Sequence, residues 1–143
     1  MKVAIQKLDP RAAVPSYGSD YSAGADLYAL EETVIKPGQT ILVRTGLAME
    51  IPVGYGGFIY ARSGLATKQG LAPANKVGVI DADYRGEIMV ALLNHSNELR
   101  TVGAGERIAQ LVIAPFLKAE FEVHHTLSDT ARGSGGFGST GTK

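Results

Sequence analysis

Residues 79–86 bring two carboxylates, an aromatic ring and a guanidinium together within five positions of the chain. Apolar runs flank this stretch, residues 77–80 before it and 88–93 after it, and the pattern predicts a β-hairpin with a loop longer than two residues. Asp81 directly follows the first apolar run, where a carboxylate can be held rigidly enough to act as a general base. The alternative is an acidic turn exposed to solvent, and this stretch alone leaves both open.

A candidate anion site lies where an apolar strand passes into the one predicted helix, residues 63–70. Free backbone N–H groups and the helix dipole face outward at a helix start. Ser63 is predicted to cap this helix and Gly70 to end it. Arg62 adds a bidentate donor, and Gly64 lets a ligand approach the backbone closely. Phosphate suits such a site, and the alternative is an ordinary cap beside a surface arginine.

Two polar residues interrupt apolar runs. Asp26 is costly to bury unpaired, so it is expected to pair with an arginine, inside the structure or at a subunit contact, or to hold a metal-bound water. Gln110 is expected either to make a core hydrogen bond or to face a site, because a buried amide needs partners. The histidines His95, His124 and His125 lack metal-ligand spacing with carboxylates and are expected at the surface.

The last twelve residues, 132–143, contain five glycines. Such a segment cannot pack a core of its own and is expected to be mobile when the protein is alone. Glycine-rich loops can wrap phosphates with backbone N–H groups, and Phe137 offers a face on which a base could stack. The alternative is a flexible linker, which gives no reason for Arg132 and Phe137. We therefore divide the chain into a domain over residues 1–131 and a tail over residues 132–143.

The rest of the chain is predicted to form short strands. Apolar residues alternate most clearly over residues 40–52, which predicts a half-buried strand bent at Gly46. Further strands are expected at residues 3–8, 58–62, 98–102, 107–113 and 119–123. Many short strands, one short helix and regular turn signals predict an all-β fold, a jelly-roll-like barrel or sandwich.

The overall composition excludes several classes of function. The 143 residues suit one domain, and Lys+Arg and Asp+Glu are both 14, which argues against nucleic acid or an anionic membrane as a partner. The absence of cysteine excludes disulfides, thiol nucleophiles and cysteine-ligated zinc. The lack of cysteine makes a cytoplasmic location the default expectation, and a periplasmic protein, which can also lack cysteine, is the alternative. The sequence shows no charged-then-apolar leader and no apolar run long enough to span a bilayer.

Taken together, these stretches resemble the homotrimeric, all-β dUTPases (deoxyuridine triphosphate nucleotidohydrolases) over nearly the whole chain. Five motifs carry the resemblance, in the family's order: AGADLYA (23–29), ARSGLA (61–66), GVIDADYRGEI (78–88), GERIAQL (105–111) and RGSGGFGSTG (132–141). Any one of them is weak, but five in order are specific. Ala104 stands where the fourth motif often has proline, which affects a turn and not the site.

The resemblance implies hydrolysis of dUTP to dUMP and pyrophosphate with Mg²⁺, which keeps uracil out of DNA and supplies dUMP for thymidylate synthesis. Asp81 would orient and deprotonate the water that attacks the α-phosphorus. Tyr84 would lie against the deoxyribose and leave no room for a 2′-hydroxyl. Asp26 would hold the Mg²⁺ through water.

The resemblance also implies the remaining substrate contacts. The uracil base would be recognised by backbone groups around Asn75, Gly78, Val79 and Ile80, with Met89 nearby. Phosphates would be held by Arg62, Ser63, Gly64 and Gln110. The tail would supply Arg132 for the γ-phosphate, Phe137 over the uracil, and Gly138, Ser139 and Thr140. In the family each site takes the phosphate motifs from one chain, the hairpin from a second and the tail from a third, which implies a homotrimer.

Two alternatives stay open on the sequence. The related dCTP deaminase shares the fold, but it would need a catalytic glutamate near the hairpin and would lack the tail in this form. A non-catalytic, nucleotide-binding regulatory β-domain would not need Asp81 together with the phosphate residues, and both are present.

Overall fold

The computed structural model describes residues 1–137, which form twelve short strands and one helix. Their bounds are β1 (Ala4–Lys7), β2 (Ser16–Tyr17), β3 (Ala25–Tyr28), β4 (Thr33–Ile35), β5 (Thr40–Arg44), β6 (Leu47–Glu50), β7 (Tyr55–Ala61), α1 (Ser63–Gln69), β8 (Leu71–Pro73), β9 (Gly78–Ile80), β10 (Met89–Asn94), β11 (Arg100–Val102) and β12 (Arg107–Pro115). The strands are short because glycine and proline turns punctuate the alternating apolar runs. The fold is all-β with one short helix, as predicted.

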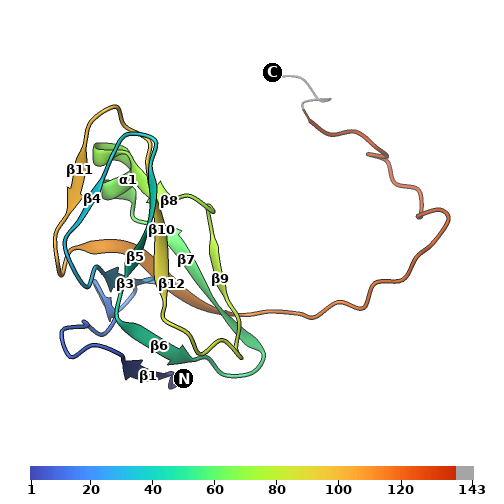
Figure 1. The fold of residues 1–143 in the computed structure, drawn as a ribbon. Helices are drawn as coiled ribbons and strands as arrows, with labels where there is room; N and C mark the ends of the chain where they lie inside the picture. Colours follow the sequence, from blue (N-terminus) through green and yellow to red (C-terminus); the bar gives the residue numbers. More distant parts are fainter. Residues whose placement is uncertain (138–143) are drawn as a thin grey trace.

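The strands form two larger antiparallel sheets and two short two-stranded ones (Figure 1). The larger sheets have the strand orders β2-β3-β12-β7-β9 and β5-β10-β8, and the smaller ones pair β1 with β6 and β4 with β11. Within residues 1–137 the sheets do not close into a barrel. Of the two predicted architectures, the sandwich is therefore the one observed.

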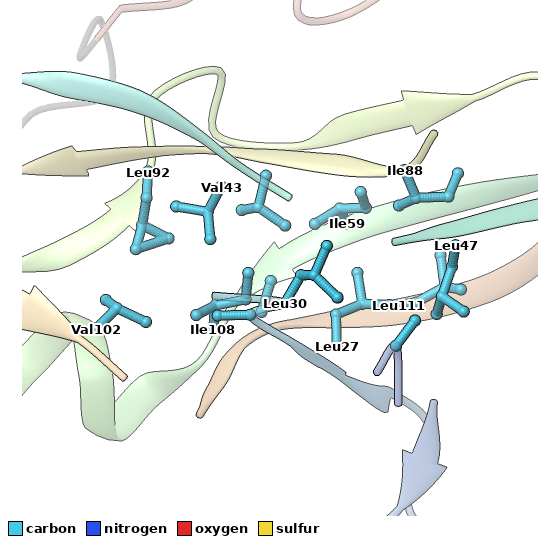
Figure 2. Packing of buried hydrophobic residues seen from close by; sticks show 14 of the residues in the cluster. Leu27, Leu30, Val43, Leu47, Ile59, Ile88, Leu92, Val102, Ile108 and Leu111 are labelled. Atoms are coloured by element: carbon cyan, nitrogen blue, oxygen red, sulfur yellow. The ribbon is translucent and has the colours of Figure 1, made fainter. Parts of the chain in front are cut away.

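One hydrophobic core fills the space between the two larger sheets (Figure 2). Leu27 and Leu111 come from the five-stranded sheet, and Val43 and Leu92 come from the three-stranded sheet opposite. These four side chains are at most 4% exposed. Because side chains alternate along a strand, β10 contributes every second residue to this layer, Val90 and Leu92 among them.

Leu92→Ala is expected to lower the free energy of unfolding by about 2–5 kcal/mol, because it leaves a cavity among fully buried neighbours. Urea unfolding followed by circular dichroism measures the loss. Leu99→Ala is the matched control, since Leu99 is 57% exposed and its truncation is expected to cost no more than about 0.5 kcal/mol. Equal losses in both variants would contradict this picture of the core.

The predicted strand over residues 40–52 is broken at Gly46, as expected, into β5 and β6. Gly46 has a φ of +70°, and a Cβ added there would lie 2.9 Å from the Cβ of Ala12. Both facts favour glycine at this position. The bend sends the two halves to different sheets, because β5 pairs with β10 and β6 pairs with β1.

The predicted β-hairpin around residues 81–88 was wrong, because the strands before and after this segment do not pair with each other. β9 pairs with β7 in the five-stranded sheet, whereas β10 pairs with β5 and β8 in the other. Residues 81–88 therefore cross from one sheet to the other. Two apolar runs on either side of a turn need not pair with each other as strands, because the partner of each strand depends on core packing and register.

The predicted helix is present as α1, and Gly70 ends it with a φ of +67°. The prediction that Ser63 caps the helix was wrong. Arg62 occupies the N-cap position without a side-chain capping hydrogen bond, and Ser63 is the first helical residue. The Ser63 carbonyl accepts a hydrogen bond from Thr67 Oγ1 at 2.7 Å. No helix among residues 1–137 is long and apolar enough to cross a membrane.

Regular structure ends with β12, and residues 116–137 run away from the sandwich (Figure 1). The strand predicted over residues 119–123 was wrong, because this segment pairs with no strand among the described residues. Its apolar side chains are exposed, Leu117 at 99% and Phe121 at 93%. An alternating sequence becomes a strand only where a partner edge is available.

Candidate active site

A pocket of about 240 Å³ lies beside β9, at the edge of the five-stranded sheet. Its wall includes seven of the residues that the sequence singled out: Asn75, Gly78, Val79, Ile80, Asp81, Tyr84 and Met89. The remaining wall is formed by Leu42, Ile59, Glu87 and Ile88. The pocket is therefore apolar at its back and polar where the crossing segment 81–88 borders it.

β9 is the edge strand of its sheet and pairs only with β7 among the described residues. An edge strand presents backbone N–H and C=O groups that a ligand can use in place of another strand. Gly78 brings this edge close to its neighbours, since an added Cβ would lie 3.2 Å from the Cβ of Ile59 and 3.5 Å from Nδ2 of Asn75. The pocket can therefore bind a flat ring that donates and accepts hydrogen bonds.

Asp81 follows the last residue of β9 and borders the pocket. Its carbonyl accepts a hydrogen bond from the Tyr84 N–H at 3.1 Å, which closes a turn. Arg85 reinforces the turn, because its Nη1 donates to the carbonyl of Ala82 at 2.7 Å and its Nη2 lies 3.5 Å from Oε1 of Glu50. The Asp81 carboxylate itself accepts no hydrogen bond from the described residues, so it is free to receive a proton from a bound water.

Tyr84 is held at the hydroxyl end of its ring. Its hydroxyl donates a hydrogen bond to the Glu87 carbonyl at 2.9 Å, and its ring lies against Gly86. A Cβ added to Gly86 would come within 2.6 Å of the Cζ of Tyr84. The ring therefore has a defined position in the pocket wall.

A second cluster surrounds Asp26, a β3 residue only 6% exposed. Nε of Arg62 lies 3.4 Å from its Oδ1, and Nη1 of Arg107 lies 3.4 Å from its Oδ2. Of the alternatives for Asp26, pairing with arginine inside the chain is the one observed. Oδ1 is nonetheless buried without a hydrogen bond among the described residues, because the Arg62 donor is not aligned with it.

Gln110 lies in the middle of β12, opposite Asp26 of β3 and Tyr60 of β7. Its neighbours Ala109 and Leu111 are buried in the core, so the alternation of the strand turns Gln110 to the outer face. Gln110 therefore faces the Asp26 cluster and makes no core hydrogen bond among the described residues.

The pocket and the Asp26 cluster lie at different strands of the five-stranded sheet. Ile59 and Ile80 of the pocket wall belong to the core face, whereas Asp26 and Gln110 belong to the outer face. β7 also lies between β9 and β12, a separation of about 10 Å at the usual strand spacing. Within residues 1–137 of one chain, the pocket and the Asp26 cluster are therefore two separate groups of residues.

The predicted tail residues lie apart from both groups (Figure 1). Arg132 Nε donates a hydrogen bond to the Gly135 carbonyl at 2.8 Å, within the tail itself, and the Phe137 side chain is fully exposed. Gly138, Ser139 and Thr140 lie outside the described residues. The three histidines are exposed, as predicted.

Comparison with families of known proteins gives a match over nearly the whole chain. A family model described as dUTPase covers residues 10–141. The chain belongs to the dUTPase family. The matched range includes all five motifs on which the resemblance was based, so the resemblance is confirmed at the level of the family.

Relatives and solved structures agree with the dUTPase family. The deoxyuridine 5′-triphosphate nucleotidohydrolase of Nautilia profundicola is 53% identical over 141 residues, covering 99% of both chains. That of Picosynechococcus sp. is 49% identical over 142 residues, covering 99% of this chain and all of the relative. The Staphylococcus bacteriophage 80alpha dUTPase, solved with dUpNHpp, superposes with a TM-score of 0.91 at 29% identity, covering 98% of each chain.

These dUTPase relatives establish the activity and the fold class. The chain is a dUTP diphosphatase, which hydrolyses dUTP to dUMP. Its fold is the jelly-roll β fold of the dUTPases. Neither the dCTP deaminase nor the non-catalytic binding domain is the function that these relatives support.

One similar solved structure, a mutant of the dUTPase of Staphylococcus aureus phage phi11, has a structural Mg(II) ion. It superposes on this chain with a TM-score of 0.79 at 25% identity, covering 88% of this chain and 98% of its own. In this chain, residues 1–137 contain no group of three His, Cys, Asp or Glu side chains that could hold a metal ion. Oδ1 of Asp26, which accepts no hydrogen bond from the described residues, can accept one from a metal-bound water. The residues therefore fit an ion held mainly by other ligands.

Sequence reasoning missed several residues of the candidate site. Arg107 belongs to the fourth motif, and its position at the start of an apolar strand was a signal that could have been used. Leu42 and Ile59 carry no such signal, because apolar residues on separate strands reach the pocket only through the fold. Glu87 was quoted within the third motif without a role.

Proposed function

We propose that the pocket beside β9 binds the deoxyuridine part of dUTP and that Asp81 activates the water that attacks the α-phosphorus. The water gives its proton to the Asp81 carboxylate, the new P–O bond forms, and pyrophosphate leaves. The observation that carries the proposal is a carboxylate free of protein hydrogen bonds at the border of a pocket made by the predicted residues. Fixed placement of the base and water supplies much of the rate in phosphoryl transfer.

The free edge of β9 is proposed to read uracil, with the Asn75 amide beside it. Backbone groups at this edge can match the hydrogen-bond donors and acceptors of uracil. Cytosine has a different arrangement of donors and acceptors, so its binding would leave buried polar groups unpaired. The close approach of Gly78 to Ile59 supports a tight fit that excludes the thymine methyl group. Met89 and Ile80 supply apolar contact for the ring.

The outer cluster is proposed to bind the phosphates through Arg62, Ser63, Gly64 and Gln110. An added Cβ at Gly64 would meet no described atom within 4 Å, which leaves room for a phosphate beside its backbone. We add Arg107, which is half exposed and shares Asp26 with Arg62. Asp26 would hold Mg²⁺ through a water at its Oδ1. When bound, Mg²⁺ offsets the negative charge of the phosphates.

A homotrimer with shared sites is part of the proposal. In one chain the pocket lies at the β9 edge of the five-stranded sheet and the phosphate cluster lies at β3 and β12, beyond β7, and the tail over residues 132–143 leaves the domain over residues 1–131. These features suit a site that takes its pocket, its phosphate cluster and its tail from different chains. We also place the enzyme in the cytoplasm, because a cysteine-free chain has no need of an oxidising compartment.

Pyrophosphate release with Mg²⁺ from dUTP, measured beside dTTP, dCTP and UTP, tests the proposed contacts together. Release from dUTP alone is expected. Release from dTTP would contradict the tight fit around uracil, and release from UTP would contradict the role of Tyr84. Removal of Mg²⁺ with a chelator is expected to reduce turnover of dUTP.

Gly86→Ala is expected to lower the preference for dUTP over UTP about tenfold, because the new methyl group displaces the Tyr84 ring. The ratio of the two kcat/KM values measures the effect. Gly103→Ala is the control, since a Cβ there would lie 3.8 Å from its nearest described neighbour, Oε2 of Glu106. An unchanged preference in Gly86→Ala would show that the position of the ring does not decide sugar selection.

A further inference from the structure

Glu87 places a carboxylate in the wall of the pocket, with its side chain 16% exposed. Both of its oxygens lie 3.1 Å from Nε of Arg44, and Oε1 also accepts a hydrogen bond from the Gly46 N–H at 2.9 Å. A carboxylate only accepts hydrogen bonds, and its negative charge would repel an anionic nucleotide. Arg44 offsets that charge, so the contacts of Glu87 are directed to the protein and not to the substrate.

The bend between β5 and β6 supplies the donors for Glu87. β5 ends at Arg44 and β6 begins at Leu47, so the Gly46 N–H lies outside both strand ladders. The same bend holds the next residue of the crossing segment, because Thr45 Oγ1 donates to the Ile88 carbonyl at 2.6 Å. The end of the segment 81–88 is thus tied to one fixed corner of the fold.

Tyr84 is linked to this corner through the Glu87 carbonyl, and the N–H of the same peptide, that of Ile88, donates to the Leu47 carbonyl at 2.7 Å. The Tyr84 hydroxyl donates to the backbone carbonyl of Glu87, the residue whose side chain is tied to Arg44 and Gly46. A shift of Glu87 would move the acceptor of the Tyr84 hydroxyl and therefore the ring. Arg85 does not replace this link, because it contacts the carbonyls of Ala82 and Tyr84 at the other end of the segment.

We propose that Glu87 and Arg44 form a positioning pair that sets the place of the Tyr84 ring and so the selection of deoxyribose over ribose. The inference rests on the proposed role of Tyr84 at the sugar. Neither member of the pair touches the reacting atoms. Their effect is on which sugar the pocket accepts.

A positioning pair and a merely structural ion pair can be told apart by the property that changes when the pair is removed: substrate preference in the first case and stability in the second. Exposed ion pairs contribute little to stability, and the Arg44 side chain is 44% exposed. Arg44→Met is therefore expected to leave the melting temperature near the wild-type value, whereas Glu87→Ala also removes the acceptor of the Gly46 N–H and is expected to lower it. The preference for dUTP over UTP is expected to fall, since a displaced ring leaves room for the 2′-hydroxyl.

The test compares kcat/KM for dUTP and UTP, and the melting temperature, in wild type, Tyr84→Ala, Glu87→Ala, Glu87→Gln and Arg44→Met. Glu87→Ala is expected to lower the preference about tenfold. Glu87→Gln is expected to stay closer to wild type, because its amide oxygen still accepts from the Gly46 N–H. The double variant with Glu87→Ala and Arg44→Met is expected to match the stronger single variant, as for residues that act as a unit.

Glu98→Ala is the matched control, because Glu98 forms another surface pair with Arg100, at 3.1 Å, remote in sequence from the segment 81–88. Its preference is expected to equal that of wild type. If Tyr84→Ala loses the preference and both Glu87→Ala and Arg44→Met keep it, the positioning pair is refuted while the role of Tyr84 stands. If wild type does not prefer dUTP over UTP, or if Tyr84→Ala keeps the wild-type preference, then Tyr84 does not select the sugar. The proposed role of Tyr84 is then refuted, and so is the inference that rests on it.

Discussion

Asp81→Asn is expected to lower kcat for dUTP by about 10²–10⁴-fold, the usual contribution of a general base, and to leave dUTP affinity near the wild-type value. The amide keeps the size of the side chain but cannot take the proton of the attacking water. The backbone turn is retained, since it depends on the Asp81 carbonyl and the Tyr84 N–H. Single-turnover pyrophosphate release and calorimetric titration with a non-hydrolysable dUTP analogue separate chemistry from binding.

Asp83→Asn is the matched control for this prediction. Asp83 is the second carboxylate of the segment 81–88, it is exposed, and it does not border the pocket beside β9. Its amide variant is expected to turn over dUTP at nearly the wild-type rate. Near-normal hydrolysis by Asp81→Asn, or an equal loss in both variants, would refute Asp81 as the specific base.

Deletion of residues 132–143 is expected to reduce kcat/KM for dUTP by at least about 10²-fold, because the proposed contacts of Arg132 and Phe137 are lost. The melting temperature is expected to change little, since Arg132 bonds only within the tail among the described residues and Phe137 is fully exposed. Calorimetry and steady-state kinetics on the shortened chain measure both. A large fall in melting temperature would make the tail a structural element instead.

Mixing the two inactive proteins tests whether sites are shared between chains. The Asp81→Asn chain carries an intact tail, and the shortened chain carries an intact Asp81. If one site takes its base and its tail from different chains, co-refolded mixtures are expected to recover part of the wild-type activity. Mixtures as inactive as their components would show that each site uses the base and the tail of the same chain.

Local sequence signals predicted much of the fold. The alternation over residues 40–52 and the bend at Gly46 were correct, because a period of two and a positive φ are local properties. The helix and its end at Gly70 were correct for the same reason. The strand over residues 119–123 was wrong, since alternation shows that a segment can form a strand but not that a partner edge lies beside it.

For the candidate site too, the sequence predicted local features and missed long-range contacts. Sequence motifs identified the pocket residues from Asn75 to Met89, which lie close together along the chain. They did not show that β9 and β10 enter different sheets, nor that Arg107 shares Asp26 with Arg62. Those contacts join residues far apart in the chain, and a single sequence carries no direct signal of such pairs.

The sequence by itself determined the chemistry available to this protein: the carboxylate after an apolar strand, the arginine before a short helix, and the glycine-rich end of the chain. Side-chain type and local spacing are sufficient for that. The tertiary structure decided how these groups are arranged, with the pocket at the β9 edge of one sheet and the Asp26 cluster at its β3 and β12 strands. The physical reason is that strand pairing is chosen by the burial of a shared core, to which every strand contributes at once.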